Sequence, residues 1–296
     1  MSSTQPLDQR IEAFQSRVVG RSISDTSWPL YRGWIKKFEA WMQYEGIQDP
    51  DIGDLEAFDN FLADESVTAY PWDNGRGRPA PPGYAYSTRI TAISAAKKWV
   101  RREYGRRIPE TPGDIAIGDP EPFDPTYLSG PEVDGVFRTA QDSCNCSGCE
   151  AALRLSYDAI MRASELVRVR QADIDLTAGE VYVRATKGSQ NMTIGLADPT
   201  VEALRDHMAT IGDRERVFWN TYDRAWRPSA WATHVLRHHC EEGSHALGRH
   251  TPILHRLEGG EPFGDVYRRA RHHSPSMTAR YARKAGVSIP EWADRE

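Results

Sequence analysis

Hydrophobic side chains recur at helical spacing in the first third of the chain. One run advances by three or four residues at a time, which is typical of an amphipathic helix. Its members are Trp28, Tyr31, Ile35, Phe38 and Met42. A second run lies within 55–62, and a third, which carries many basic side chains, lies within 86–107. The pattern predicts an all-helical domain over residues 23–107, after an N-terminal tail at 1–22.

Prolines interrupt this pattern between residues 108 and 128. Because proline lacks a backbone donor and favours extended chain, we expect a linker there. Directly after it, Ser129 and Glu132 have the spacing of a capping box, with Pro131 in the first turn. These signals predict that a helix of a second domain begins at this point.

The periodicity then changes from the helical to the alternating kind. Residues 181–183 and 192–194 alternate between apolar and polar side chains, and a polar turn with Lys187 at its tip separates them. This pattern predicts a β-hairpin. Since the other segments have helical spacing, the expected fold class is mainly α with a small antiparallel sheet (α+β). The second domain would cover 129–285, followed by a C-terminal tail at 286–296.

The composition is that of a water-soluble globular protein, with 296 residues, 39% hydrophobic and 27% charged. No apolar run reaches the roughly 18 residues that a membrane helix requires. The first residues also lack the basic-then-apolar pattern of a secretion signal. We therefore expect a cytoplasmic protein without a membrane partner.

The net charge of −5 is a weak argument against a nucleic-acid partner. The distribution of charge matters more, because basic residues gather within 86–107 and within 266–284. Such segments either meet a polyanion or form solvated helix faces, and the pattern leaves both interpretations open. The candidate DNA contacts in the first segment are Arg89, Lys97, Lys98, Arg101, Arg102, Arg106 and Arg107.

The chain has four cysteines, and their spacing bears on whether it holds disulfides, a zinc ion or reduced thiols. Cys144, Cys146 and Cys149 lie close together in the sequence, and Cys240 lies far from them. This arrangement is unlike the cysteine pattern of small secreted proteins. The four thiols are a weak candidate for a structural zinc site. A loop of reduced thiols fits the same spacing.

Several cationic and titratable side chains occupy unusual positions. Arg162 lies in an apolar segment, where a buried guanidinium requires a carboxylate or a phosphate as partner. His234 and Arg237 share one face of a helix. A set of cations, imidazoles and a phenol suits a phosphate diester, because cations bind its oxygens and a phenol can act as nucleophile. The set comprises Arg162, Lys187, His234, Arg237, His272 and Tyr281.

At these residues the chain resembles the tyrosine recombinase (phage integrase) family. The motifs of that family are Arg-x-Ser-Glu on a helix, a lysine in a β-hairpin, His-x-Leu-Arg-His, and Gly-His-Ser followed by threonine and tyrosine. The resemblance covers about residues 23–285, with the helical half resembling the core-binding domain of the family. The matching positions, in the same order, are Arg162–Glu165, Lys187, His234–His238, His272, Thr278 and Tyr281.

The chain departs from the family motifs at two glycine-containing positions. Ala159, Ile160 and Met161 stand where the family has Thr-Gly-Leu, and Arg271 replaces the glycine before the third-box histidine. Neither departure deletes a catalytic residue.

The spacing of the last two motifs also departs from the family. The stretch between Arg237 and His272 is longer than in the family, and we assign the excess to residues 249–264. The longer stretch makes His273 a competitor of His272. The spacing to Tyr281 favours His272.

The resemblance implies that Tyr281 attacks the scissile phosphate and forms a 3'-phosphotyrosyl bond. Arg162 and Arg237 would clamp the phosphate and stabilise the developing charge. The bond energy would be kept in the phosphotyrosine, so the resemblance implies no cofactor, no catalytic metal and no ATP.

The other matched residues would move protons or orient the site. Lys187 would protonate the leaving 5'-oxygen, while His234 and His272 would donate hydrogen bonds and assist proton transfer. Glu165 would orient the pocket without touching DNA.

The implied partners are double-stranded DNA at specific recombination sites and other copies of the chain, which would form a tetramer on paired sites. Accessory DNA-bending factors are compatible with this role. We favour an integrase of a virus, plasmid or other mobile element. The alternatives are a non-cleaving architectural factor on the same fold and a type IB topoisomerase-like enzyme. The tail at 286–296 could dock on its own domain or on a neighbouring copy.

Overall fold

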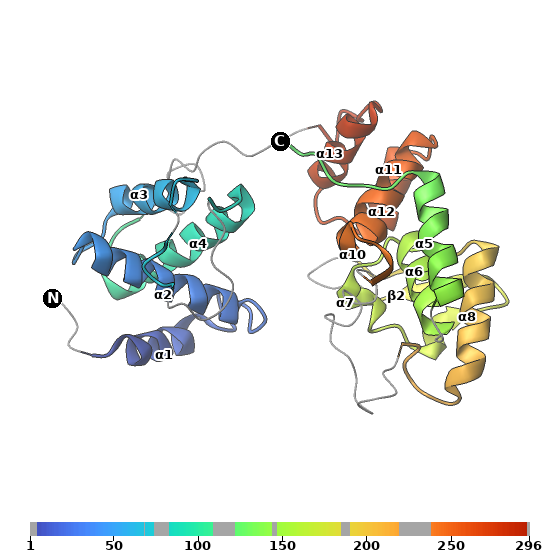
Figure 1. Ribbon diagram of the computed structural model, residues 1–296, viewed down its shortest axis with the longest axis horizontal. Coiled ribbons are helices and arrows are strands. Elements are labelled where there is room, and N and C mark those ends of the chain that lie inside the picture. The colour runs from blue at the N-terminus through green and yellow to red at the C-terminus, as the bar shows by residue number, and fades with distance from the viewer. Residues whose placement is uncertain are drawn as a thin grey trace. The chain divides into compact units, whose positions relative to one another are not determined.

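The computed structural model describes residues 5–67, 69–73, 83–108, 122–143, 147–184, 190–218 and 238–294. The chain forms two compact units, Met1–Pro122 and Phe123–Glu296 (Figure 1). The division falls inside the segment predicted as a linker. Within the described residues, no helix is long and apolar enough to cross a membrane.

The first unit is helical where it is described. Its helices are α1 (Leu7–Val18), α2 (Trp28–Glu45), α3 (Ile52–Ala63) and α4 (Tyr86–Glu103). Helix α3 begins at Asp51, whose carboxylate accepts hydrogen bonds from the backbone of Gly53 and Asp54. The core between the helices is aromatic, because Phe38, Trp41, Phe58 and Trp99 are fully or nearly fully buried. Large aromatic side chains supply much apolar area from few residues, which suits a unit of this size.

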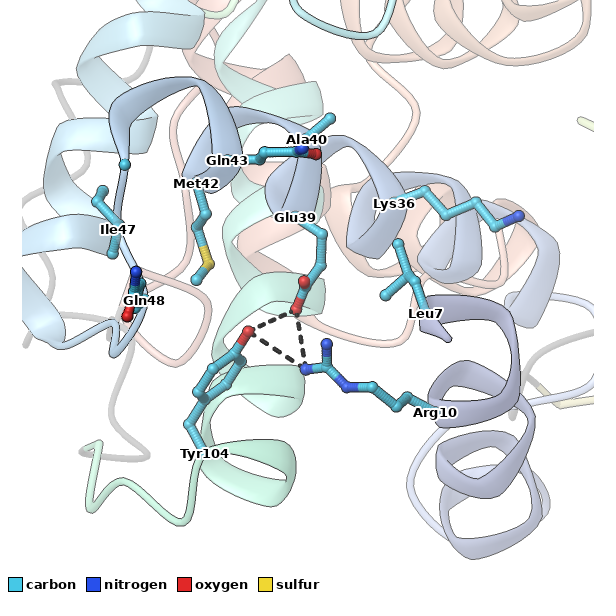
Figure 2. A pocket seen from close by; sticks show the side chains of 11 residues that line it. Leu7, Arg10, Lys36, Glu39, Ala40, Met42, Gln43, Ile47, Gln48 and Tyr104 are labelled. Carbon is cyan, nitrogen blue, oxygen red and sulfur yellow. Dashed lines mark hydrogen bonds and ion pairs between the residues drawn. The ribbon is translucent and has the colours of Figure 1, made fainter. Parts of the chain in front are cut away.

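Helix α1 lies in the segment that the sequence predicted as a tail. Three of its apolar residues belong to the core of the first unit: Ile11, Phe14 and Val18. Its Arg10 donates hydrogen bonds to Glu39 of α2 at 3.4 Å and to the hydroxyl of Tyr104 at 3.2 Å (Figure 2). The helical unit therefore begins near Leu7, and the prediction of a tail across 7–18 was wrong.

The second unit contains one small sheet among helices. Its helices are α5 (Gly130–Ser143), α6 (Ser147–Asp158), α7 (Ala163–Leu166), α8 (Asp198–Ile211), α10 (Gly243–His245), α11 (Thr251–Glu258), α12 (Phe263–Arg269) and α13 (Pro275–Ala285), with the short turns η2 (Gln171–Asp173) and η3 (Ala246–His250). The strands are β1 (Ile174–Asp175), β2 (Glu180–Val183) and β3 (Met192–Gly195), in the order β1-β2-β3 and antiparallel throughout. The predicted fold class, mainly α with a small antiparallel sheet, is confirmed.

The hairpin is built as its alternation predicts. Val181 pairs with Ile194 and Val183 pairs with Met192. Val181, Val183 and Ile194 are buried in a core that α6 and α8 share, while Tyr182 faces outward. Lys187, expected at the tip, lies outside the described residues.

The start of α5 uses the predicted pair of residues. The carboxylate of Glu132 accepts hydrogen bonds from the backbone nitrogen and the hydroxyl of Ser129, both at 2.7 Å. Satisfying a free donor at the first turn fixes where the helix begins.

The C-terminal segment packs on the second unit of the same chain. Val287 and Ile289 lie against the core around α11 and α13, and Ala293 is buried. The ring of Trp292 lies 5.6 Å from that of Phe263 and is half exposed. In this structure the segment after the tyrosine therefore docks on its own domain.

Arg89 of α4, a candidate DNA contact, lies in the core of the first unit. Its guanidinium is buried and donates to the fully buried carboxylate of Asp59 in α3 at 2.8 Å. A buried charge must be paired, so this side chain fixes α4 against α3. The prediction that Arg89 contacts DNA is contradicted by this burial.

Removal of the Arg89 guanidinium should unfold the first unit more easily. Arg89→Met leaves the Asp59 carboxylate buried without its cation, so the free energy of unfolding should fall by about 3–5 kcal/mol. Urea unfolding, followed by hydrogen exchange of α3 and α4 peptides, measures this. The double variant Asp59→Leu/Arg89→Met should recover most of the loss. A loss below about 1 kcal/mol in the single variant would show that the pair is not needed.

Candidate active site

Arg162 and Glu165 meet where helix α6 gives way to the short helix α7. The guanidinium Nη1 of Arg162 donates to Glu165 Oε1 at 2.9 Å, and the backbone nitrogen of Arg162 donates to Oε2 at 3.0 Å. The Glu165 side chain is fully buried, whereas that of Arg162 keeps 24% of its surface exposed. The carboxylate therefore anchors a guanidinium that can still reach a substrate.

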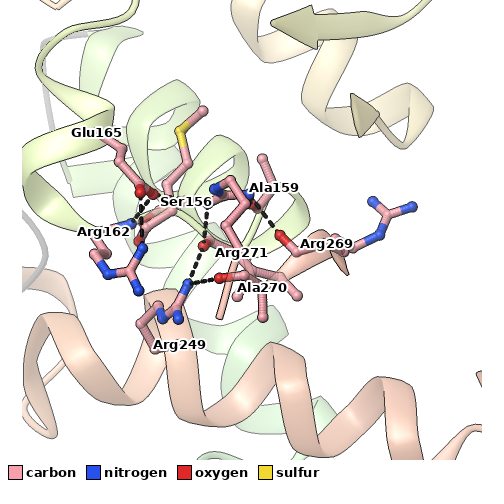
Figure 3. Close-up of polar contacts among 10 residues, drawn as sticks. Ser156, Ala159, Arg162, Glu165, Arg249, Arg269, Ala270 and Arg271 are labelled. Carbon is pink, nitrogen blue, oxygen red and sulfur yellow. Dashed lines mark hydrogen bonds and ion pairs between the residues drawn. The ribbon is translucent and has the colours of Figure 1, made fainter. Parts of the chain in front are cut away.

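A second arginine reaches the same place from η3. Arg249 is buried, and its Nη1 donates to the carbonyl oxygens of Ile160 at 3.0 Å and Ala270 at 2.7 Å (Figure 3). These carbonyls belong to the turns that precede Arg162 and His272. Arg249 thus joins the two segments that supply the other site residues.

The backbone of η3 explains how Arg249 arrives there. Residues Ala246–His250 form a π-turn, in which the backbone nitrogen of Thr251 donates to the carbonyl of Ala246, five residues earlier. A π-turn takes up one extra residue without ending the helix. Gly248 lies within this π-turn, and a Cβ there would lie 2.9 Å from the carbonyl oxygen of Met161. A glycine at this position lets η3 approach the turn before Arg162.

Tyr281 of α13 makes its polar contact with a histidine of η3. The Tyr281 hydroxyl lies 2.8 Å from Nδ1 of His250. Burial lowers the pKa of His250 to about 4, with His245 and Arg249 adding to the effect. A neutral imidazole accepts at the ring nitrogen that carries no hydrogen, so the hydroxyl donates to Nδ1 in the tautomer protonated at Nε2. Burial also raises the pKa of Tyr281, which keeps the phenol protonated at rest.

His272 stacks on the ring of the same tyrosine. The two ring centroids are 5.9 Å apart with an interplanar angle of 18°, and Nδ1 of His272 lies 2.7 Å from the hydroxyl of Thr278. Burial, then Arg249 and Arg162, lower the pKa of His272 to about 3. His273 is exposed. The structure therefore places His272, rather than its neighbour, against Tyr281.

The site has more cations than anions among the described residues. Arg162, Arg249 and Arg271 surround one carboxylate, Glu165. Burial would raise the pKa of Glu165, but Arg271 and Arg162 together lower it below its ordinary value. Burial and the neighbouring Arg162 lower the pKa of Arg249 to about 9, which leaves it cationic at neutral pH. An anionic substrate would balance this excess of positive charge.

The structure brings together four of the predicted site residues: Arg162, Glu165, His272 and Tyr281. The other three predicted catalytic residues, Lys187, His234 and Arg237, lie outside the described residues. Their roles therefore stay predictions.

Three residues near Tyr281 were missed by the sequence analysis: His245, Arg249 and His250. The ring of His245 lies 5.8 Å from that of His250. The signal was present, since residues 245–250 read His-Ala-Leu-Gly-Arg-His, which is the family motif with one residue inserted. The long spacing between Arg237 and His272 was a second signal.

The basic side chains of α4 are divided between core and surface. Unlike Arg89, the other basic side chains line an open hollow beside Val18 and Ser22: Lys98, Arg101 and Arg102 of α4, and Arg106 and Arg107, which follow the helix. Arg106 also forms an ion pair with Asp49. The basic side chains around this hollow suit phosphate contacts. Lys97 lies in the same helix and is partly buried.

The zinc prediction concerns residues that are only partly described. Cys149 and Cys240 are buried, while Cys144 and Cys146 lie outside the described residues. Among the residues with assigned positions, no group of three histidine, cysteine or acidic side chains could hold a metal ion. Burial raises the pKa of Cys240 to about 11, so its thiol is protonated at neutral pH.

The low pKa values of His250 and His272 predict that the second unit loses stability in acid. Both rings are neutral when folded and take up protons on unfolding below their ordinary pKa of 6.5. The free energy of unfolding should therefore fall as the pH drops from 6.5 to about 4. Urea unfolding read by hydrogen exchange of α11 and α13 peptides checks this. The slope should be shallower in His250→Gln, and an unchanged slope would contradict a neutral His250.

Comparison with known proteins gives the family. The family model described as the phage integrase family matches residues 127–286, more than half of the chain. Tyrosine recombinase XerC of Chlorobaculum parvum (strain DSM 263 / NCIMB 8327) is 27% identical over 161 residues, covering 49% of this chain and 48% of the relative. Putative integrase/recombinase y4eF of Sinorhizobium fredii (strain NBRC 101917 / NGR234) is 28% identical over 157 residues, covering 46% and 56%. The chain spans about half the length of the curated relatives it matches.

Solved structures share the fold. Lambda integrase bound to DNA has a TM-score of 0.66 at 16% identity, with 99% of both chains covered. The Tn1549 transposon integrase in complex with transposon right end DNA has a TM-score of 0.64 at 12% identity, with 96% of both chains covered. At such identities the likeness shows the fold alone. Together with the family match, it leads to one conclusion: the chain belongs to the phage integrase family of tyrosine recombinases.

Proposed function

We propose that the protein is a site-specific DNA recombinase that cuts and rejoins DNA through a phosphotyrosine at Tyr281. One observation carries the proposal. The hydroxyl of Tyr281 contacts a neutral His250 at 2.8 Å, and two arginines lie beside it. A nucleophile, a proton acceptor and cations for the charged phosphate are the parts that this reaction requires.

The proton of Tyr281 has a defined destination in this proposal. As the phenolic oxygen forms its bond to phosphorus, Nδ1 of His250 accepts the proton, and the bond to the 5'-oxygen breaks. Because burial raises the pKa of Tyr281, a base is needed at that moment. The leaving oxygen takes a proton to become a 5'-hydroxyl, and Lys187 is the predicted donor. Attack of a 5'-hydroxyl on the phosphotyrosine reverses these steps and rejoins a strand.

Arg162 and Arg249 stabilise the negative charge on the phosphate oxygens in this proposal. The sequence analysis predicted Arg237 as the second arginine that clamps the phosphate. Arg249 is the better candidate, because its charge interacts with Arg162, His272 and Tyr281, and burial keeps water from screening these interactions. His245, which directly precedes the π-turn that ends at His250, then has the role predicted for His234, donating a hydrogen bond and assisting proton transfer.

Duplex DNA and other copies of the chain are the proposed partners. The solved relatives include a lambda integrase tetramer bound to a Holliday junction, which has a TM-score of 0.65. The exposed basic side chains of α4 would contact phosphates, and binding would weaken as salt rises. An integrase of a mobile element is the role we favour, in line with relatives named integrase/recombinase.

A nicked suicide substrate tests the proposal. The binding site is first selected with the protein from random duplexes, and the nick lets the cleaved fragment diffuse away. Wild-type protein should form a covalent protein–DNA band without added metal or ATP, and Tyr281→Phe should form none, because it lacks the nucleophilic oxygen. Peptide mapping of the band should give a nucleotide-modified Tyr281.

The control is DNA affinity, which Tyr281→Phe should keep. Wild-type protein that binds its site yet gives no covalent band would overturn the enzyme proposal and favour a non-cleaving architectural factor. A covalent band in Tyr281→Phe would place the nucleophile elsewhere.

A further inference from the structure

Arg271 is a buried arginine whose Nη1 and Nη2 donate within the protein, while its Nε is buried without a hydrogen-bond partner among the described residues. Its side chain is 1% exposed. Nη1 donates to the carbonyls of Ala159 at 3.0 Å and Arg269 at 2.6 Å, and Nη2 donates to the carbonyl of Ile160 at 2.8 Å and to Glu165 Oε2 at 2.8 Å. A guanidinium engaged in this way does not face a substrate. Its contacts instead converge on the segment that leads into Arg162 (Figure 3).

The first of these contacts is at the end of helix α6. Ala159 and Ile160 directly follow its last residue, Asp158, and the backbone nitrogen of Met161 donates to the carbonyl of Ser156, as in a Schellman motif. The guanidinium of Arg271 accordingly satisfies two carbonyls at a helix C-terminus, where a cation is favourable. Arg271 itself lies just after helix α12, which ends in the same way, with the backbone nitrogen of His272 donating to the carbonyl of Tyr267.

Both helix ends adopt a backbone conformation that favours glycine. Ile160 has a φ of 48° and Arg271 a φ of 50°, and they are the non-glycine residues with positive φ in the described part of the chain. A β-branched residue there is strained, so the surrounding contacts must hold the turn in place. The carbonyl of Ile160 accepts hydrogen bonds from both Arg271 and Arg249.

The remaining contact of Arg271 is its ion pair with Glu165. Glu165 is fully buried and is shared by two guanidiniums, with Arg271 Nη2 at 2.8 Å and Arg162 Nη1 at 2.9 Å. With Arg271 present, the carboxylate is balanced and Arg162 keeps its charge for an anion. Without Arg271, Glu165 would neutralise Arg162 alone and hold it more tightly.

We propose that Arg271 is a positioning residue for DNA cleavage: it ties the ends of α6 and α12 together and shares Glu165, so that Arg162 and His272 converge on the phosphate. The inference rests on the proposed function, because it assigns Arg271 a role in that same site. Arg271 stands where the family motif has glycine, a residue that has no side chain to make these contacts.

Two glycine substitutions distinguish the effect of losing the guanidinium from the effect of relieving a strained backbone. Arg271→Gly and Ile160→Gly each relieve a positive φ, but only Arg271→Gly removes the guanidinium. At saturating selected DNA, Arg271→Gly should lower the first-order rate constant of covalent complex formation by about tenfold, less than the hundredfold or more for a direct donor. Its Kd for DNA should stay within about twofold. Ile160→Gly also removes a fully buried core side chain, so both variants are compared at a temperature where circular dichroism shows them folded, and the rate of Ile160→Gly should then fall less than that of Arg271→Gly.

A double variant tests whether Arg271 acts by sharing the charge of Glu165 with Arg162. In Arg271→Gly the carboxylate of Glu165 is in excess, so Glu165→Gln added to Arg271→Gly should restore part of the lost rate. A purely structural role would make the double variant slower than the single one, and that result would overturn the proposal. So would Arg271→Gly cleaving as fast as wild type. If wild-type protein itself forms no covalent complex, the proposed function fails and this inference fails with it.

Discussion

A single buried carboxylate, Glu165, determines where positive charge collects in the second unit. Its oxygens accept hydrogen bonds from the guanidiniums of Arg162 and Arg271. Arg249 lies close enough to interact electrostatically with both arginines. One negative charge among three guanidiniums cannot balance them, so the region favours an anion such as a phosphate diester. Burial strengthens each of these interactions, because little water screens them.

The residues proposed to face this anion come mostly from irregular ends and turns of helices. Arg162 follows the end of α6, His272 follows the end of α12, and Arg249 lies in a π-turn, whereas Tyr281 lies within the regular helix α13. Regular helices fix the scaffold, and the interruptions direct side chains from different segments at one point. Arg249 and Arg271 hold these interruptions through the carbonyl of Ile160.

Local signals in the sequence predicted much of the fold. Alternation predicted the hairpin that pairs Val181 with Ile194, and helical spacing predicted α2 and α3. The sequence did not reveal that Arg89 is buried, because its partner Asp59 belongs to a different helix. Helix α1 was missed because its apolar residues are buried only through contacts with distant parts of the first unit, which the local sequence does not reveal. In the site, Arg162 and Tyr281 were predicted from motifs of regular spacing. Arg249 was not, because one inserted residue hid its motif.

The assignment of Arg249 to the phosphate is the central claim, and a pair of single-turnover measurements tests it most directly. At saturating DNA, Arg249→Ala should lower the rate constant of covalent complex formation by about 100- to 1,000-fold, the cost of removing a donor to the transition state. Arg237→Ala is the matched control and should stay within about threefold of wild type. The reverse result, with Arg237→Ala inactive and Arg249→Ala active, would contradict the account and return the second arginine to Arg237.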